Sequence, residues 1–526
     1  MNLHILNLKK LLIVLFILSN YNSFSQLWPK IFGNNIDAYG QDILESYDHG
    51  YSICGCIMKN AEDFKFGWII KTDINGNIIW NKKYGHPGYE NFFWDFDKTS
   101  DNGLIACGAT AQVDSWRDPL FVKLDPCGEI EWCKIYLSAQ MNYATGVIHL
   151  PDGQFLGMLA YYGGDAQHIR ISLVKMDAMG EPVWIKHLAQ EDSTISNEEG
   201  INLDLMPDSN YLVSGSGSSP LTPYFIKTNT TGDELWNLKW PIGAGGFAGR
   251  SAFSSNGMIY NASSMQFPGI PKVPYLLKFS EVGEVIDQYP LLGTDTVERG
   301  GAQSLLIMND STVYIGLTWT DNPMYDPAYC DIIKTDTIGE IILQRRLIDD
   351  AYPPTSIIKS FDDKILAIGY YHVDSNWDIY MWKMNQDLED DTLYTQPLTY
   401  DSLCPYEIQS DTVALDCGLF VNIDELPTQE QYESSIKISP NPARDWVVLT
   451  LPDVVSPGAM EVQVYDVFGK EARGQGSMEA GGHGSVGKMP VNRMVLLDVS
   501  GYPSGMYIVV ATDQKGRRYT GKVVVR

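Results

Sequence analysis

The sequence has little positive charge. Its 526 residues include 38 Lys and Arg against 65 Asp and Glu, which gives a formal net charge of −27 at pH 7. A field of that sign repels phosphate backbones and anionic lipid surfaces. The composition therefore argues against nucleic acid as a partner and against membrane docking through a basic patch.

Long apolar runs and metal-ligand spacings are absent as well. Beyond the N-terminal segment, no stretch approaches the roughly 18 apolar residues that a membrane-spanning helix needs, so we expect no transmembrane span in the mature chain. The eight histidines form no His-Glu-x-x-His motif, and the eight cysteines form no Cys-x2-Cys pair. We therefore predict no metal site, no cofactor and no catalytic residues.

Residues 1–25 have the pattern of a signal peptide. Lys9 and Lys10 precede an apolar stretch, Leu11–Leu18, that is too short to cross a bilayer. Small residues then predict cleavage before Gln26, and no cysteine follows at the distance that lipidation requires. We expect the chain to pass through the periplasm and to be secreted or displayed on the cell surface.

Cysteines in an exported protein can form disulfides. Cys404 and Cys417 are the best candidate pair, because a bridge between them would close a short loop in a turn-rich segment. Cys54 and Cys107 occupy equivalent places in neighbouring repeats, where we expect buried thiols that pack as small hydrophobic side chains. The connectivity of the other cysteines is left open.

One phrase, first seen as IIKTDINGNIIW at residues 69–80, recurs along the chain at intervals of roughly 52 residues, the spacing of one four-stranded propeller unit. Its turn glycines are Gly76, Gly128, Gly180, Gly232, Gly283 and Gly339. The β-branched and aromatic run predicts a strand, Asp or Asn begins a tight turn, and glycine takes the position with positive φ. A second strand follows, and a seventh copy keeps Lys383 but lacks the glycine.

Two further strands precede each phrase, so each unit contains four short antiparallel strands that must stack on their neighbours to bury a face. Four-stranded units stacked radially make a β-propeller. We predict an all-β fold in which residues 26–400 form a seven-bladed β-propeller. We expect Gln26–Asn34 to supply the outer strand of the seventh blade and to close the ring. The segment near Leu393 competes for that place.

Two residue types recur within the phrase. Tryptophan follows the glycine by four residues at Trp80, Trp132, Trp184 and Trp236. Lysine ends the first strand at Lys71, Lys123, Lys175, Lys227, Lys278, Lys334 and Lys383. The functional alternatives are that the tryptophans are platforms for sugars and that the lysines form a ring that binds an anion. The periodicity favours packing between blades for the tryptophans and repeated salt bridges for the lysines. The spacing of Asp, Gly and Trp resembles the tryptophan-docking repeat of quinoprotein propellers. The resemblance implies the propeller fold, and we do not extend it to the quinone cofactor.

The chain changes character after the repeats. Residues 401–434 are expected to form a linker. Residues 435–526 place alternating apolar residues in short strands between Gly and Pro turns, which predicts a small Ig-like β-sandwich. Three motifs stand out in order: Pro440-Asn441-Pro442, the hairpin YDVFGK at residues 465–470, and DVSGYPSGMY at residues 498–507.

These motifs resemble the type A sorting domain of the bacterial type IX secretion system. On that resemblance, the sorting signal comprises Pro440, Asn441, Pro442, Asp466, Gly469, Lys470, Asp498, Gly505, Met506, Tyr507 and Lys522. The resemblance implies recognition by the outer-membrane secretion machinery, followed by removal of the domain near residues 431–435. Release from the cell and attachment to its surface both stay open.

The longer loops connect the second and third strands of each unit, so they should gather on one face. Aromatic and acidic residues there form the predicted binding surface: Tyr161, Tyr162, Trp319, Asp321, Tyr325, Asp326 and Trp377. We expect a secreted or surface-displayed binding or scaffold module for a glycan or a protein. The alternative is a propeller enzyme, a polysaccharide lyase or hydrolase with its site in the central channel. Charged residues that converge from several blades on the channel would favour the enzyme.

Overall fold

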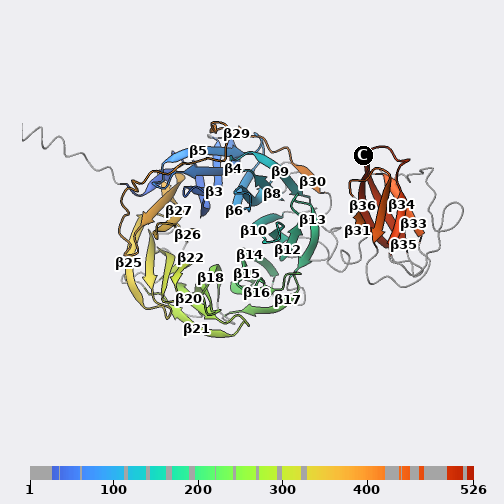
Figure 1. Ribbon diagram of the computed structural model, residues 1–526. Coiled ribbons are helices and arrows are strands. Elements are labelled where there is room, and N and C mark those ends of the chain that lie inside the picture. Colours follow the sequence, from blue (N-terminus) through green and yellow to red (C-terminus); the bar gives the residue numbers. More distant parts are fainter. Residues whose placement is uncertain are drawn as a thin grey trace, which may run out of the picture. The chain divides into compact units, whose positions relative to one another are not determined.

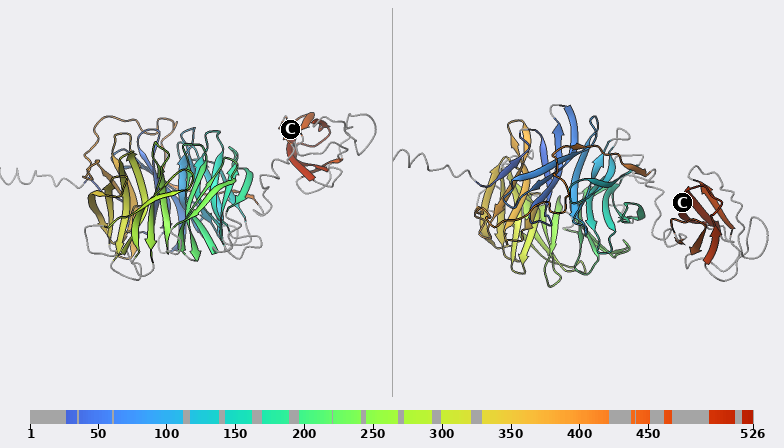
Figure 2. Two further views of the ribbon diagram at one scale, coloured as in Figure 1. Left: turned by 90° about the horizontal axis from the view of Figure 1, so that it is seen from below. Right: turned by 45° about the horizontal axis from the view of Figure 1, so that its top comes forward.

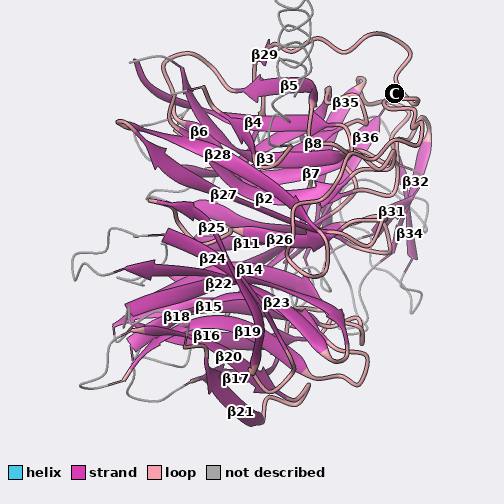
Figure 3. Cartoon of the chain, turned by 90° about the vertical axis from the view of Figure 1, so that its left-hand side faces the viewer, coloured by secondary structure: helices cyan, strands magenta, loops and turns pink. Residues whose placement is uncertain are grey.

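The computed structural model describes residues 27–34, 36–59, 62–111, 117–137, 142–161, 169–188, 196–219, 221–240, 245–267, 272–292, 299–320, 329–420, 437–439, 441–450, 461–466, 494–512 and 518–525. In those residues every regular element is a strand (Figure 3). The chain divides into two compact units, one holding nearly all residues up to 425 and the other beginning at residue 426.

In the described part of the first unit the strands form seven sheets, which we call blades and number in chain order. Blade 1 contains β2 (Ala38–Glu45), β3 (Tyr51–Lys59), β4 (Glu62–Thr72) and β5 (Ile78–Tyr84). Blade 2 contains β6 (Asn91–Lys98), β7 (Leu104–Thr110), β8 (Asp118–Leu124) and β9 (Ile130–Tyr136). Blade 3 contains β10 (Tyr143–His149), β11 (Phe155–Tyr161), β12 (Arg170–Met176) and β13 (Pro182–His187).

The remaining blades repeat this order of strands. Blade 4 contains β14 (Ser196–Leu205), β15 (Tyr211–Ser219), β16 (Leu221–Thr228) and β17 (Glu234–Lys239). Blade 5 contains β18 (Gly245–Phe253), β19 (Ile259–Gln266), β20 (Val273–Phe279) and β21 (Val285–Pro290). Blade 6 contains β22 (Arg299–Asn309), β23 (Thr312–Thr320), β24 (Tyr329–Thr335) and β25 (Ile341–Asp349). Blade 7 contains β26 (Ser356–Lys359), β27 (Ile365–Val373), β28 (Asn376–Met384) and β1 (Lys30–Phe32).

The blades stand around a common axis, with the first strand of each blade nearest the centre and the last strand outside (Figure 1). Seen from the side, the strands cross the ring from one face to the other (Figure 2). The ring has two faces. In each blade the first, inner strand begins at the same face as the loop that joins the second strand to the third, and we call this the mouth face. The fold is therefore all-β and propeller-like, as the repeat predicts.

The N-terminal segment closes the ring. β1 pairs antiparallel with β28, matching Lys30 to Met381 and Phe32 to Ile379. Trp28 is fully buried, and its ring lies 2.9 Å from where a Cβ on Gly76 would be. The prediction that this segment supplies an outer strand is confirmed for the described residues. The competing segment near Leu393 pairs with no strand of blade 7 there.

The repeated tryptophans and lysines join blades to one another. The Trp80 ring packs on Gly128 of the next blade, and Trp132 and Trp236 pack on the next turn glycines in the same way. Those glycines have positive φ, as expected. Five of the seven repeated lysines pair with an aspartate of the turn between first and second strands, among them Lys71 with Asp48 at 2.5 Å. Lys334 pairs instead with Asp387, and Lys278 lies over the Tyr260 ring. The structural interpretation is confirmed for these three tryptophans and for the six lysines that form salt bridges.

Residues 401–420, which we call the strap, fall within the predicted linker and pair with strands of the ring. β29 (Thr412–Val413) pairs parallel with β5, and β30 (Gly418–Phe420) pairs parallel with β9. The predicted Cys404–Cys417 bridge is wrong. Cys404 is bonded to Cys127 and Cys417 to Cys133, because the strap crosses from blade 1 to blade 2 and brings each cysteine beside blade 2.

In the second unit the described residues form two three-stranded sheets. One contains β31 (Lys437–Ser439), β32 (Trp446–Thr450) and β34 (Met494–Asp498), and the other β33 (Glu461–Asp466), β35 (Gly505–Thr512) and β36 (Arg518–Val525). A single core that includes Val447, Val464, Val509 and Val523 packs between them. The Ig-like topology stays a prediction.

Candidate functional site

The structure places two of the seven residues of the predicted binding surface in the core. Trp319 is 2% exposed and donates a hydrogen bond from Nε1 to Asp331 at 3.0 Å. Tyr161 is 4% exposed and stacks on His187. Both are core residues, because they end second strands that neighbouring strands cover, so placing them on the surface was wrong. Trp377 is half-buried and reaches solvent. Tyr162, Asp321, Tyr325 and Asp326 lie outside the described residues.

Trp377 belongs to an aromatic group that sequence reasoning missed. Its ring centroid lies 5.3 Å from Tyr352, 5.6 Å from Tyr370 and 6.3 Å from Tyr39. Tyr352 is 37% exposed, and Tyr39 and Tyr370 are half-buried. Tyr39 comes from the start of β2 in blade 1, whereas the others come from the segments around β27 and β28. The group therefore lies on the mouth face, across the boundary between blades 7 and 1.

A second aromatic group continues around the channel mouth. Phe92 and Trp94 of β6 lie 4.4 Å apart, and Trp94 lies 4.7 Å from Tyr143 at the start of β10. Tyr39 and Trp94 both pack against the small core that contains Phe92 and Cys56, so the two groups are continuous. We call the combined set the aromatic strip; it comprises Tyr39, Phe92, Trp94, Tyr143, Tyr352, Tyr370 and Trp377.

Charged groups flank the aromatic strip. Lys65 Nζ lies 5.1 Å from the centre of the Tyr39 ring. Arg117 lies 4.9 Å from the Phe92 ring and pairs with Glu90 at 3.0 Å. Burial, together with the Asp37 carboxylate, raises the pKa of Tyr39 to about 12, so its hydroxyl stays a hydrogen-bond donor at physiological pH. The strip thus combines apolar faces with polar groups at its edges.

Charged side chains from four blades meet among the inner strands near the axis of the ring, a region that we call the channel. Asp42 comes from β2, Asp95 from β6, Asp204 from β14 and Arg250 from β18. Arg250 Nη2 lies 2.9 Å from Asp42 Oδ1. This is the convergence that the enzyme alternative requires, and the sequence shows it only as single residues in separate repeats.

Burial disfavours the charged forms of Asp95 and Asp204. Burial raises the pKa of Asp95 well above its usual range, and the neighbouring Asp42 carboxylate adds to the shift. Burial also raises the pKa of Asp204 to about 7, against the opposing effects of Arg250 and of a hydrogen bond from Asn202. Asp95 also accepts a hydrogen bond from the Val147 amide at 3.0 Å. Each carboxyl of the cluster therefore has a partner within the fold.

Six of the seven inner strands carry a bulge, which sets the pattern of side chains near the axis of the ring. The register of six inner strands slips at the same place, and the residues there are Gln41, Trp94, Thr145, Ile201, Arg250 and Gln303. A bulge redirects side chains and tightens the local twist. Of these six, Arg250 alone is charged, and aligning the inner strands of the repeats would have revealed it.

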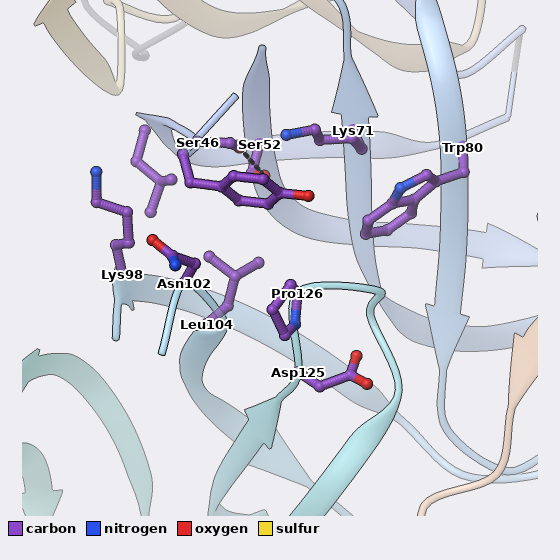
Figure 4. A pocket seen from close by; sticks show the side chains of 11 residues that line it. Ser46, Ser52, Lys71, Trp80, Lys98, Asn102, Leu104, Asp125 and Pro126 are labelled. Carbon is purple, nitrogen blue, oxygen red and sulfur yellow. Dashed lines mark hydrogen bonds between the residues drawn. The ribbon is translucent and has the colours of Figure 1, made fainter. Parts of the chain in front are cut away.

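A pocket at the opposite face lies between blades 1 and 2 (Figure 4). Lys71, Trp80 and Tyr47 line it together with Asp125 and Pro126 of the blade 2 turn. Its interior of about 10 Å³ holds roughly one water molecule. Its lysine and tryptophan are the repeated packing residues, so it is a gap between blades rather than a ligand site.

Two kinds of feature are absent from the described part of the chain. No group of three or more His, Cys, Asp or Glu residues there is placed to hold a metal ion. The same residues contain no helix long and apolar enough to cross a membrane.

The second unit matches a known family. Residues 437–526 match the family described as the secretion system C-terminal sorting domain. These residues are a type IX secretion sorting domain. The protein is therefore exported through the type IX system to the cell surface or the extracellular space. The subdivision into type A stays a prediction.

The structure brings two sorting-signal residues together. Asn441 donates a hydrogen bond to the Lys522 carbonyl at 3.0 Å and accepts one from the Val524 amide at 2.9 Å. Pro442, Asp466, Asp498, Gly505, Met506 and Tyr507 lie within the described residues, whereas Pro440, Gly469 and Lys470 do not. Tyr507 is buried and donates its hydroxyl to the Pro503 carbonyl.

Solved structures resemble the chain at low identity. An ulvan lyase from a polysaccharide lyase family matches at 12% identity and a TM-score of 0.45, over 68% of this chain and 96% of that one. Drosophila Plexin A in complex with Semaphorin 1b matches at 9% identity and a TM-score of 0.44, over 73% of this chain and 99% of that chain. A protein of unknown function from Dyadobacter fermentans matches at 9% identity and a TM-score of 0.40, over 67% of this chain and 97% of that chain. None of the curated proteins matches this sequence.

Proposed function

We propose that the protein is an exported binding module that holds an extracellular glycan on its aromatic strip. The observation that carries the proposal is the continuity of the strip around the channel mouth, with Tyr352, Trp377 and Trp94 all reaching solvent. Tyrosine and tryptophan suit a ligand that is apolar on one side and hydrated on the other. A sugar ring has this character, because its C–H face is apolar and its edge carries hydroxyls.

The groups beside the strip support a saccharide ligand. Lys65, Arg117 and Glu90 offer donors and acceptors at its edges, and the Tyr39 hydroxyl is protonated. Ligand sites typically combine aromatic lining with a few placed polar groups. The rings of the strip that reach solvent lie on blades 7, 1 and 2, whereas Phe92 and Tyr143 are buried. A span of three blades suits an extended chain better than a single sugar.

A propeller enzyme remains the second candidate, because Asp42, Asp95 and Asp204 converge in the channel. Carboxyls with raised pKa values are candidates for general acid and base roles. We prefer the binding module because each carboxyl is engaged within the fold. Asp42 pairs with Arg250, Asp95 accepts from a backbone amide and Asp204 accepts from Asn202.

A single assay separates the two candidates. The full chain is tested against neutral, uronate-containing and sulfated polysaccharides, with binding and release of new chain ends measured on the same samples. We expect at least one polysaccharide to bind without release. Release that disappears in Asp95→Asn would establish the enzyme, and absence of binding to every polysaccharide would contradict both candidates.

A further inference from the structure

The two ends of the ring meet in blade 7, where the N-terminal β1 pairs with β28. We call the junction of β26, β27 and β28 with β1 and blade 1 the seam. The strands that close it are short, with three residues in β1 and four in β26. Inner strands of the other blades have seven or more residues. Because ladder hydrogen bonds scale with strand length, the ladders that β1 and β26 form at the two edges of blade 7 are short.

Arg250 reaches both sides of this seam from across the channel. It lies in blade 5, and Figure 1 shows β22 of blade 6 between β18 and β26. Its Nη2 contacts Asp42 of blade 1 at 2.9 Å, and its Nε donates to the Thr355 carbonyl at the start of blade 7 at 3.0 Å. Thr355 in turn donates its hydroxyl to the Gly40 carbonyl of blade 1 at 3.0 Å.

The geometry of the repeat does not require arginine at this position. The matching bulge positions of five other blades carry Gln41, Trp94, Thr145, Ile201 and Gln303. The Arg250 side chain is 24% exposed and its partner Asp42 only 10%, so the pair is largely shielded from solvent. A planar guanidinium with several fixed donors can bind a carboxylate and a carbonyl at once, which an ammonium does less well.

We propose that Arg250 is a latch that holds the seam between blades 7 and 1 closed. The aromatic strip crosses this same seam, with Tyr39 on blade 1 and Tyr370 and Trp377 on blade 7. The latch therefore keeps the two halves of that aromatic group in register. This consequence for binding rests on the proposed function, whereas the latch itself does not.

Hydrogen exchange on the full chain without any ligand tests the latch. The variants are Arg250→Met and the double variant Arg250→Met with Asp42→Asn, which removes the unpaired carboxylate that the single change leaves behind. We expect amides of β1 and β26 to exchange at least ten-fold faster in both variants. Amides of β11 and β12, in blade 3, should keep their wild-type rates, because opening at the seam is local.

Two further variants make the result decisive. Gln303→Met changes the same bulge position in blade 6, and it should leave seam exchange unchanged. Arg250→Lys keeps the charge and should raise seam exchange less than Arg250→Met does. If Arg250→Met fails to fold, the double variant and Arg250→Lys carry the test. Wild-type seam exchange in the double variant, or faster exchange spread evenly over the ring, would overturn the latch.

Loss of glycan binding is measured separately. A loose seam with weakened binding would support both the latch and its role in the strip. A loose seam with unchanged binding would leave the latch standing and overturn its role in ligand binding. An unchanged seam would overturn the latch whatever the binding assay gives.

Discussion

Asp204 should lower the stability of the protein at neutral pH, and Asp204→Asn should relieve that cost. The pKa of Asp204 rises from 3.8 to about 7 in the folded chain, chiefly through burial. The folded state therefore holds this proton where the unfolded state has lost it. The free energy of unfolding should fall as the pH rises from about 4 to about 7 and stay level above that range.

The size of the effect follows from the shift. A difference of about three pKa units corresponds to an upper limit of about 4 kcal/mol. Asp204 keeps some contact with water, so we expect about half of that. Asp204→Asn should then stabilise the protein by about 2 kcal/mol at pH 8 and by little at pH 4.

Urea denaturation of the full chain between pH 4 and pH 8 measures this difference. Asp208→Asn is the matched control, since Asp208 lies in the next turn of the same blade. Its pKa is lowered, with the hydrogen bond from Lys227 the chief cause of the lowering against the opposing effect of burial. Its contribution is therefore present above the unfolded pKa and lost in acid, so Asp208→Asn should destabilise at pH 8. Unchanged pH dependence in Asp204→Asn, or destabilisation at pH 8, would refute the reasoning.

Three further changes test the packing. Cys404→Ser should lower the free energy of unfolding by about 3 kcal/mol on the loop-entropy relation, because with the Cys133–Cys417 bridge intact the lost bond closes a loop of only roughly 20 residues. Peptide mapping should show early proteolysis in the strap, and an intact strap would contradict the assigned bridge. Trp80→Ala should lower the free energy of unfolding, measured by denaturation, by about 3 kcal/mol, because it removes the ring that packs on Gly128 and leaves a cavity there. A loss of less than about 1 kcal/mol would show that this contact contributes little to stability. Lys71→Met should lower the free energy of unfolding by about 3 kcal/mol because it leaves the buried Asp48 carboxylate without its ion-pair partner. Adding Asp48→Asn should restore much of that free energy. No recovery would show that lost packing, and not the unpaired charge, causes the destabilisation.

The repeat predicted the ring because it is a local signal. Each turn glycine takes positive φ, and each following strand has its own β-branched run, so alignment of the phrases reveals the blades. Trp28 extended the same pattern to the N-terminus and identified the closing strand. Packing of Trp80 on the next blade followed from periodicity alone.

The residues of the candidate site could not be predicted from the sequence in the same way. Asp42, Asp95 and Asp204 are single residues in separate repeats, and only the ring brings them together. Tyr39 and Trp377 meet for the same reason, although 338 positions separate them in the printed sequence. The disulfides were missed because proximity along the chain favoured Cys404 with Cys417, whereas the strap places each beside blade 2.

The most direct test of the account is the affinity of strip variants for the polysaccharide that the full chain binds best. Trp377→Ala and Trp94→Ala should each weaken binding at least ten-fold in affinity gels. Phe361→Ala, which removes an aromatic ring that is 41% exposed in the turn between β26 and β27 on the opposite face, should bind as the parent does. Wild-type affinity in both strip variants would contradict the assignment of the strip as the binding site.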